Sequence, residues 1–289
     1  MLSHLLFYPF YHLLRYRRRV VRENLSMAFP SMNKKSRKKI ELTFYHHFCD
    51  YFFETVKLMT ISRKNIMKRV RIEGLESVEN CLKNRQPCFL LLSHTFNWEW
   101  LTSLPLALQF KETLVAQVYQ AEKNSSINRL LLHLRSRFSS VNVSKEQLSM
   151  RMARWNKEHE PVLVGIMGDL APSWEQTGYW LKFFGRETPV ITGVEKIARH
   201  YDCAVFYCTI TLLGRGRYCF SIKPLTLHAS RCEPYKITDC YFKNLEDDIA
   251  QAPAQWLWSH NRWKRSRNVC EMRDFILQSM KNKGNIRPK

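Results

Sequence analysis

The sequence predicts an α/β protein whose central sheet is mixed, mostly parallel and flanked by helices. Residues 1–60 have the periodicity of helices, and from residue 70 onward apolar runs alternate with amphipathic stretches. The runs at 87–93 and 161–167 are almost wholly apolar, which is typical of strands that are covered on both faces. Strands that alternate with helices indicate a single sheet between helical layers.

The first 60 residues are expected to be helical with one interruption. The segment 24–30, which ends in Phe-Pro, predicts a break, and residues 31–37 open a basic helix. Large apolar side chains then recur at helical spacing, which predicts a helix face packed on the core. These residues are Ile40, Phe44, Phe48, Tyr51 and Phe52.

The remaining elements are expected in regular alternation. Strands are predicted at 87–93, 113–118, 161–167, 179–184, 204–211 and 218–223, and helices at 97–108, 125–138, 145–159, 192–200, 235–250 and 270–280. Ser144 is expected to cap the helix 145–159, with Gln147 in the capping-box position. In sheets of this kind we expect the active site in loops at the strand ends.

Composition narrows the class of protein. Of 289 residues, 45% are hydrophobic and 25% charged, which excludes wholesale disorder. Lys and Arg number 46 against 25 Asp and Glu, a net charge of +21, so the surface favours anionic partners. Nine cysteines include no CxxC pair, which predicts free thiols in a reducing compartment and no metal site.

The N-terminus combines an apolar, aromatic stretch with a basic cluster. Residues 1–14 are mostly apolar, and five arginines follow between positions 15 and 22. The positive run follows the apolar run, unlike a signal peptide, and no stretch has the length of a membrane span. We therefore expect residues 1–30 to form a helical, membrane-associating interfacial anchor and residues 31–289 the main domain. The alternative is an N-terminal helix packed on that domain.

The motif with the clearest chemistry is Ser93-His94-Thr-Phe-Asn-Trp-Glu99. His94 is expected in the loop after a buried strand, and Glu99 in the first turn of the next helix, so their side chains can converge. A carboxylate on one imidazole nitrogen raises the basicity of the other, which can then accept a proton from a hydroxyl. Ser93 is expected to point away from His94. The alternative is a buried histidine satisfied by a nearby carbonyl.

Several ordered blocks extend this motif. Residues 91–99 resemble the His-x4-acidic motif of glycerolipid acyltransferases, and residues 16–267 as a whole resemble the lipid A biosynthesis acyltransferases, the late lauroyl/myristoyl transferases. The blocks that carry the resemblance are Tyr16–Asn24 with Phe29-Pro30, Tyr45–Glu54, His94 with Glu99, Val118-Tyr119 with Arg135 and Arg137, Gly168-Asp169, Phe183–Gly185 with Thr188, Gly193 and Ala198, and Trp256–Lys264. The resemblance implies a glycerolipid acyltransferase-like fold.

The resemblance also implies a reaction. Members transfer an acyl chain from acyl carrier protein, or from acyl-CoA, to a hydroxyl of a lipid A precursor, without a cofactor. His94 would be the general base and Glu99 would orient it. The expected location is the cytoplasmic face of a Gram-negative inner membrane. Residues implied in substrate binding are Asp169, Gln120, Lys123, Arg135, Arg137, His260, Arg262 and Lys264.

Position 120 departs from the family pattern, since Gln120 stands where an arginine is usual. If that arginine normally stabilises negative charge, another cation must replace it, and the candidates are Lys123, Arg129, Arg135 and Arg137. The basic runs 34–39 and 262–267 suit an acidic carrier protein, lipid phosphates or an anionic membrane surface.

Three other functions compete with this interpretation. The acceptor could instead be an aminolipid, a mannoside or a lysophospholipid. A nucleic-acid-binding protein fits the charge, but no recognition motif is present and the basic runs lie at the chain ends, so no nucleic acid is expected. A lipid esterase is disfavoured because no Gly-x-Ser-x-Gly elbow occurs.

Overall fold

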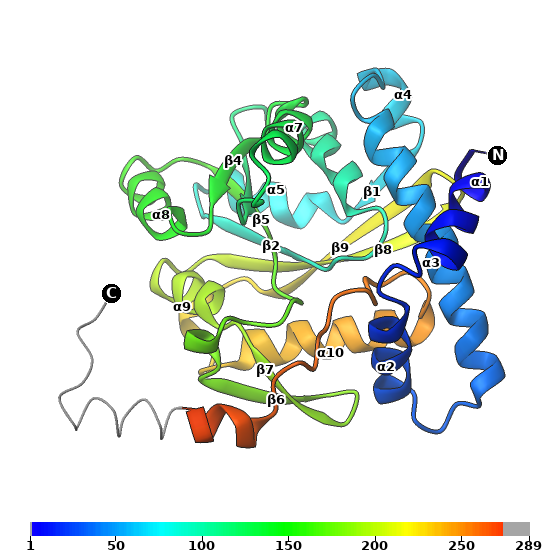
Figure 1. Ribbon diagram of the computed structural model, residues 1–289. Helices are drawn as coiled ribbons and strands as arrows, with labels where there is room; N and C mark the ends of the chain where they lie inside the picture. The colour runs from blue at the N-terminus through cyan, green and yellow to red at the C-terminus, as the bar shows by residue number, and fades with distance from the viewer. Residues whose placement is uncertain (1, 274–289) are drawn as a thin grey trace.

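The computed structural model describes residues 2–273, and a seven-stranded sheet crosses its centre (Figure 1). The strand order is β1-β9-β8-β2-β5-β3-β4. Its strands are β1 (Val70–Glu73), β2 (Cys88–Leu92), β3 (Leu114–Tyr119), β4 (Val141–Ser144), β5 (Val162–Met167), β8 (Ala204–Gly214) and β9 (Arg217–Thr226). A separate antiparallel hairpin is formed by β6 (Tyr179–Phe183) and β7 (Arg186–Val190).

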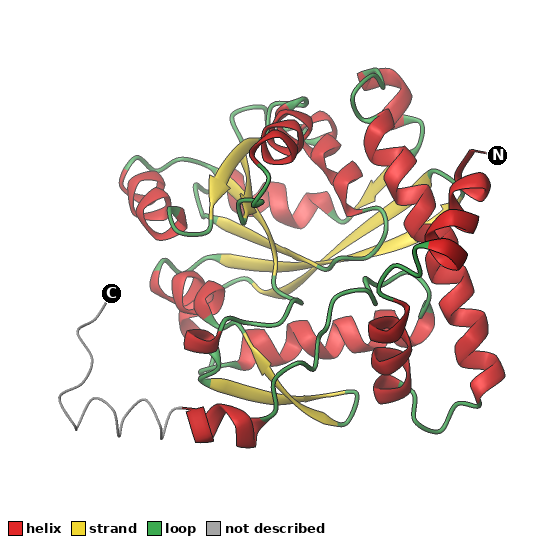
Figure 2. Cartoon of the chain, viewed as in Figure 1, coloured by secondary structure: helices red, strands yellow, loops and turns green. Residues whose placement is uncertain are grey.

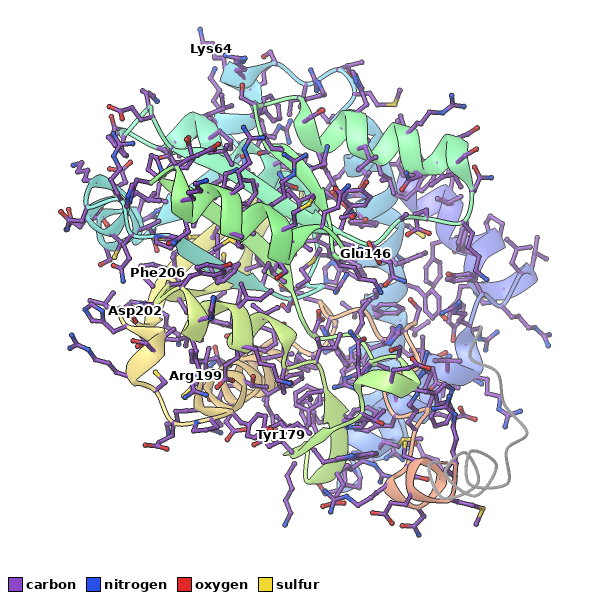
Figure 3. All side chains as sticks on the ribbon, turned by 90° about the vertical axis from the view of Figure 1, so that its left-hand side faces the viewer. Lys64, Glu146, Tyr179, Arg199, Asp202 and Phe206 are labelled. Atoms are coloured by element: carbon purple, nitrogen blue, oxygen red, sulfur yellow. The ribbon has the colours of Figure 1, made fainter. Side chains whose placement is uncertain are left out.

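The sheet is mixed and mostly parallel, as predicted. Strands β8, β2, β5, β3 and β4 run parallel to one another, while β9 is antiparallel to β8 and parallel to β1. Every residue of β2 is buried, which accounts for its continuous apolar sequence. Phe206 of β8 is likewise wholly buried, whereas Lys64 extends from the surface (Figure 3).

Helices cover both faces of the sheet (Figure 2). One face carries α5 (Leu75–Lys83), η2 (Trp98–Ser103), α6 (Leu104–Ala107) and α7 (Ser125–Ser136), with α4 (Arg63–Met67) nearby. The other face carries α9 (Gly193–His200) and α10 (Lys236–Gln251), and α8 (Leu148–Lys157) contributes to the same apolar core. The two buried clusters are therefore separated by the sheet.

The N-terminal 60 residues are helical, as predicted, but the break is shorter. The helices are α1 (Leu2–Tyr8), η1 (Pro9–Leu13), α2 (Arg18–Ala28) and α3 (Lys34–Lys57). Asn24 lies inside α2, because its buried amide donates to the carbonyls of Trp258 and His260 rather than to the local backbone. The chain leaves the helix only at Phe29-Pro30, where proline cannot continue it.

Residues 2–28 pack closely on the rest of the chain. Phe7 and Tyr11 are buried, and the Tyr11 hydroxyl donates to Glu41 of α3 at 2.8 Å. Arg22 also donates to Glu41. Within residues 2–273, each helix is either too short or too polar to span a bilayer. The role of residues 1–30 as an interfacial anchor stays a prediction.

Several details of the predicted elements are wrong or missing. Ser144 caps no helix, because it ends β4, whose Val141 pairs with Ala116 of β3, and α8 begins only at Leu148. The segment 97–108 is a 3-10 turn followed by one α-helical turn, not one helix. Strands β1, β4 and β7 and helices α4 and α5 were not predicted. Of the helix expected at 270–280, residues 274–280 lie outside the described residues.

The turn between β1 and α5 gives a test of the fold. Gly74 has φ +81°, and a Cβ atom there would overlap the main-chain carbonyl of Ile222 in β9. We expect Gly74→Ala to lower the free energy of unfolding by at least about 2 kcal/mol. The measurement is urea unfolding, with Gly178→Ala as control, because no atom would contact a Cβ at that position. Equal effects of the two substitutions would contradict this packing.

Candidate functional site

Two neighbouring strands at the centre of the sheet, β2 and β5, are each followed by a polar residue at the same edge of the sheet. Strands β2 and β5 are parallel neighbours, and Leu92 at the end of β2 pairs with Met167 at the end of β5. His94 and Asp169 both follow two residues later. Because the carboxyl ends of parallel strands meet at one edge of the sheet, this register brings the two side chains together.

His94 and Asp169 form a direct pair. The ring Nδ1 lies 2.7 Å from Asp169 Oδ1, and the His94 main-chain N–H donates to Oδ2 at 2.9 Å. The Trp256 indole also donates to Oδ2, at 2.8 Å. Burial raises the pKa of the wholly buried Asp169 carboxyl, but the His94 and Trp256 contacts outweigh it and bring the pKa to about 2.

The ionisation of Asp169 fixes the tautomer of His94. A carboxylate only accepts hydrogen bonds, so Nδ1 of the neutral ring must carry the hydrogen and Nε2 must present its lone pair. Nε2 has no hydrogen-bond partner among the described residues, and the side chain keeps 14% of its surface exposed. His94 is therefore arranged to accept a proton at Nε2 from a molecule that reaches it.

The loop that carries His94 is held by the C-terminal part of the chain. Thr95 forms an antiparallel bridge with Trp256, and the Phe96 N–H donates to the Gln255 carbonyl at 3.0 Å. The Tyr241 hydroxyl of α10 donates to the Leu92 carbonyl at 2.6 Å. These contacts fix the end of β2 and the loop that carries His94.

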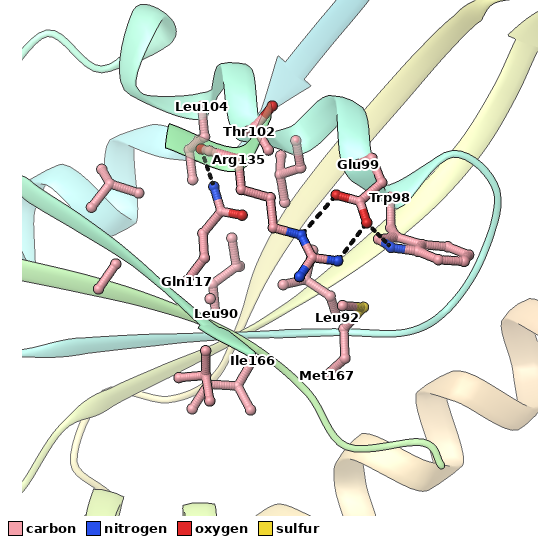
Figure 4. Close-up of a pocket in the computed structure, with 15 residues that line it drawn as sticks. Leu90, Leu92, Trp98, Glu99, Thr102, Leu104, Gln117, Arg135, Ile166 and Met167 are labelled. Carbon is pink, nitrogen blue, oxygen red and sulfur yellow. Dashed lines mark hydrogen bonds and ion pairs between the residues drawn. The ribbon is translucent and has the colours of Figure 1, made fainter. Parts of the chain in front are cut away.

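Glu99 does not pair with His94, which corrects the sequence prediction of a direct contact. Its carboxylate accepts two hydrogen bonds from Arg135 of α7, at 2.6 Å from Nη2 and 3.0 Å from Nε. Trp98 lies beside both groups: its ring centroid is 5.0 Å from that of His94, and its Nε1 donates to Glu99 Oε1 (Figure 4). Both Glu99 and Arg135 are largely buried, and this ion pair leaves neither charge uncompensated.

An apolar cavity adjoins this ion pair. Strands β2, β3 and β5 supply most of its walls, and Trp98, Glu99 and Arg135 lie at its polar end (Figure 4). Its apolar lining includes Leu90, Leu92, Leu101, Leu104, Val115, Ala116, Val118, Ile166 and Met167, together with Gly165. It therefore begins next to Trp98, which contacts His94, and extends along the sheet.

The other residues implied by the resemblance are not all in one place. Gln120 and Lys123 are exposed in the loop after β3, and Lys264 is also exposed. Arg137 donates to the Ile61 carbonyl at 3.1 Å. His260 lies nearer the pair, since its Nε2 accepts from the Ala171 N–H, and burial followed by the charge of Lys264 lowers its pKa to about 4.

Arg262 has a different position from the one expected of a substrate ligand. Its side chain is fully buried and donates to the Pro189 carbonyl of β7 at 2.9 Å. Burial lowers its pKa to about 10. Arg262 thus joins the C-terminal segment to the β6–β7 hairpin, and in this structure it has no surface on which a substrate could lie.

Sequence reasoning missed two residues of the site. Trp256 was quoted in a C-terminal block but given no role, and Tyr241 was not singled out. Both are large aromatic residues with a polar atom, and such groups usually find a hydrogen-bond partner when buried. That signal predicts that each residue donates a hydrogen bond within the core. It does not reveal that the acceptors are Asp169 for Trp256 and Leu92 for Tyr241.

Two comparisons with known proteins bear on the site. The model of a family described as bacterial lipid A biosynthesis acyltransferase matches residues 7–265, which include His94, Glu99, Asp169 and Trp256. No curated protein matches the chain. Within residues 2–273, no three His, Cys, Asp or Glu side chains are grouped as metal ligands.

The ionised state of Asp169 predicts a pH dependence of stability. Its folded pKa of about 2 lies below the ordinary value of 3.8, so the contribution is complete above about pH 4 and is lost as the pH falls toward 2. We expect Asp169→Asn to lower the free energy of unfolding by about 2 kcal/mol near pH 5. Urea unfolding at several pH values should show that the difference in free energy of unfolding between wild type and Asp169→Asn shrinks as the pH falls toward 2. A difference that does not change with pH would contradict an ionised Asp169.

Proposed function

The chain belongs to the bacterial lipid A biosynthesis acyltransferase family and is therefore an acyltransferase, and we propose that it acylates a hydroxyl of a lipid A precursor. The family implies an acyl donor and a lipid acceptor. The donor in this proposal is a thioester of acyl carrier protein or of coenzyme A. The observation that carries the proposal is the His94–Asp169 pair, in which His94 Nε2 is directed away from the carboxylate and has no hydrogen-bond partner among residues 2–273.

The proposed step is a direct transfer. His94 Nε2 takes the proton of the acceptor hydroxyl as the oxygen attacks the thioester carbonyl. The C–O bond forms, and the tetrahedral intermediate then expels the thiolate, which receives the proton from the imidazolium. Asp169 stabilises that imidazolium by its charge and by the hydrogen bond at Nδ1. No covalent enzyme intermediate is needed.

Arg135 is the best candidate to stabilise negative charge on the carbonyl oxygen. Of Lys123, Arg129, Arg135 and Arg137, Arg135 is the one that lines the apolar cavity. Burial lowers the pKa of Arg135, but the neighbouring Glu99 outweighs this and raises it, so the guanidinium stays charged. In this proposal Glu99 orients Arg135, and acts on His94 only through Trp98.

The apolar cavity supports binding of the acyl chain. It starts at the polar group of Trp98, Glu99 and Arg135, and most of its remaining lining is apolar, with Thr102 and Gln117 as the other polar residues. Such a cavity removes methylene groups from water, which is worth about 0.8 kcal/mol for each CH₂. The thioester would then lie near His94, with the first methylene groups of the chain in the cavity against β2, β3 and β5. The cavity measures about 50 Å³ in this structure, so a longer chain requires its lining side chains to move.

Exposed apolar side chains support docking on a membrane. Leu5, Tyr8, Leu13 and Leu14 are each between 65% and 79% exposed, and the arginine-rich segment 15–22 follows them directly. Further exposed apolar residues occur on α3, against which α1 packs (Figure 1), and in the turn that follows it. These are Phe52 and Val56 on α3 and Met59 in the turn. Apolar side chains beside arginines suit an anionic bilayer surface. We place the enzyme on the cytoplasmic face of a Gram-negative inner membrane.

The first prediction of this proposal concerns the lipid. Lipid A from a strain that carries His94→Ala should lack the mass of one acyl chain that lipid A from the wild-type strain contains. Purified His94→Ala enzyme should lose roughly 10²–10⁴-fold in turnover, the usual effect of removing a general base. His133→Ala, an exposed histidine on α7, is the matched control and should change neither result.

Two outcomes would contradict parts of this prediction. An active His94→Ala enzyme would overturn the mechanism. Unchanged lipid A together with a lost acyl group on another lipid would keep the mechanism and move the acceptor to an aminolipid, a mannoside or a lysophospholipid.

The second prediction concerns acyl chain length. Gly165 lies in β5 on the cavity wall, and a Cβ there would make only ordinary contacts with Leu92 and Ala116. We expect Gly165→Ala to fold and to lower kcat/KM for the longest accepted chain by about 10-fold or more relative to a shorter one. Val164→Ile is the control, since Val164 belongs to the core on the opposite face. The same shift in both variants would contradict the assigned cavity.

A further inference from the structure

A second hollow, distinct from the apolar cavity, lies where α3 ends and β9 begins. It measures about 440 Å³, and its lining includes four cationic side chains, Lys57, Lys68, Arg69 and Arg217, with the polar groups of Ser62 and Asn65. We call these six residues the basic hollow. None of them belongs to the motifs that identify the family.

The four cations of the basic hollow have no carboxylate partner within residues 2–273. Neighbouring arginines do have one: Arg215 pairs with Asp50, and Arg71 pairs with Glu73. The nearest acidic residue of α3, Glu54, is turned inward and accepts from Asn97 and Tyr218. Positive charge has therefore gathered around this hollow although carboxylates lie close by.

Local structure explains two of these charges at most. Lys57 is in the last turn of α3 and Lys68 is the C-cap of the five-residue helix α4, and the helix dipole favours a cation at such ends. That argument does not apply to Arg69 or Arg217, which lie outside both helices. Arg69 is held in place by a hydrogen bond from its Nη1 to the Gly216 carbonyl at 3.3 Å. Concentrating like charges in one hollow is unfavourable unless an anion offsets it.

The shape and donors of the hollow favour a compact anion. Guanidinium and ammonium groups with a hydroxyl and an amide are the donors that proteins use for phosphate oxygens. A concave site suits a small group with several negative charges better than it suits the broad, convex acidic face of a folded protein. The chemistry thus points to phosphate groups.

Hydrogen bonds connect the elements that form the basic hollow to the reaction site. Glu54, one helical turn before Lys57, accepts from the amide of Asn97, the residue that caps η2 and accepts from the Glu99 N–H. On the other side, the Ile61 carbonyl in the hollow's wall accepts from Arg137, two residues beyond Arg135. The elements that form the hollow also hold the rim of the apolar cavity.

We propose that the basic hollow binds a phosphate-bearing part of a substrate while the acyl group is transferred at His94. This inference rests on the proposed function, because it assumes that the substrates carry phosphate. Two sources share that chemistry: the phosphates of a lipid acceptor, and the diphosphate and phosphate groups of a coenzyme A donor. The hollow would set the affinity for that substrate and leave the chemical step unchanged.

The test uses Lys68→Gln/Arg217→Gln, which removes two exposed charges that have no carboxylate partner within residues 2–273. Its matched control is Arg63→Gln/Lys64→Gln, which removes two exposed charges from neighbouring α4 positions that do not line the hollow. Inorganic pyrophosphate is first titrated into the full-length protein without substrates. We expect affinity to fall at least about 10-fold in the test variant and by less than about twofold in the control.

Steady-state kinetics then identify the source of the phosphate. A rise of about 10-fold in KM for the lipid acceptor, with kcat nearly unchanged, assigns the hollow to the acceptor's phosphates. The same rise for acyl-CoA assigns it to the donor. Equal pyrophosphate affinity in test and control variants, or unchanged KM for both substrates, would overturn the proposal. Because the titration needs no acyl transfer, failure of the proposed function would leave the pyrophosphate result intact.

Discussion

The hydrogen bond between His94 Nδ1 and Asp169 Oδ1 depends on the register of two strands. Leu92 of β2 pairs with Met167 of β5, and the two polar residues follow at equal spacing. An ionised, wholly buried carboxylate is unfavourable unless it is compensated. Here the His94 ring, the His94 main chain and the Trp256 indole all donate to Asp169. Asp169 therefore stays ionised, and Nε2 of the neutral His94 ring presents its lone pair on the opposite side.

Contacts from distant parts of the chain maintain this register. Tyr241 of α10 donates to the carbonyl that ends β2, and the segment around Trp256 bridges to Thr95. The same C-terminal segment is held by Asn24 of α2. The N-terminal helices, the C-terminal block and the sheet edge thus form one support for His94. This explains why blocks spread over most of the sequence belong to one site.

The sequence predicted the strands of the site well but not the partner of His94. Apolar runs identified β2 and β5, and His94 was correctly expected after a strand. Glu99 was chosen because it is near in sequence, whereas Asp169 lies 75 residues away. Only the strand order shows that β5, and not the intervening β3, is the neighbour of β2 on this side. A single sequence does not reveal which parallel strands pair.

Local signals failed where long-range contacts outweigh them. Ser144 has a capping-box pattern, but pairing of β4 with β3 uses that segment as a strand. Arg262 was expected at a substrate site, and burial against Pro189 instead gives it a place in the core. The basic hollow had no sequence signal at all, since its cations come from α3, from residues 68–69 and from β9. Side chains gathered from three separate segments are visible only once the chain is folded.

The central claim is that Asp169, and not Glu99, holds the Nδ1 hydrogen of His94. Nitrogen-15 NMR of the His94 ring tests it directly, by reporting which nitrogen carries the hydrogen and whether that hydrogen is in a strong hydrogen bond. We expect a hydrogen-bonded Nδ1–H in wild type that persists in Glu99→Gln and is lost in Asp169→Asn. Loss of that signal in Glu99→Gln, with persistence in Asp169→Asn, would contradict the account.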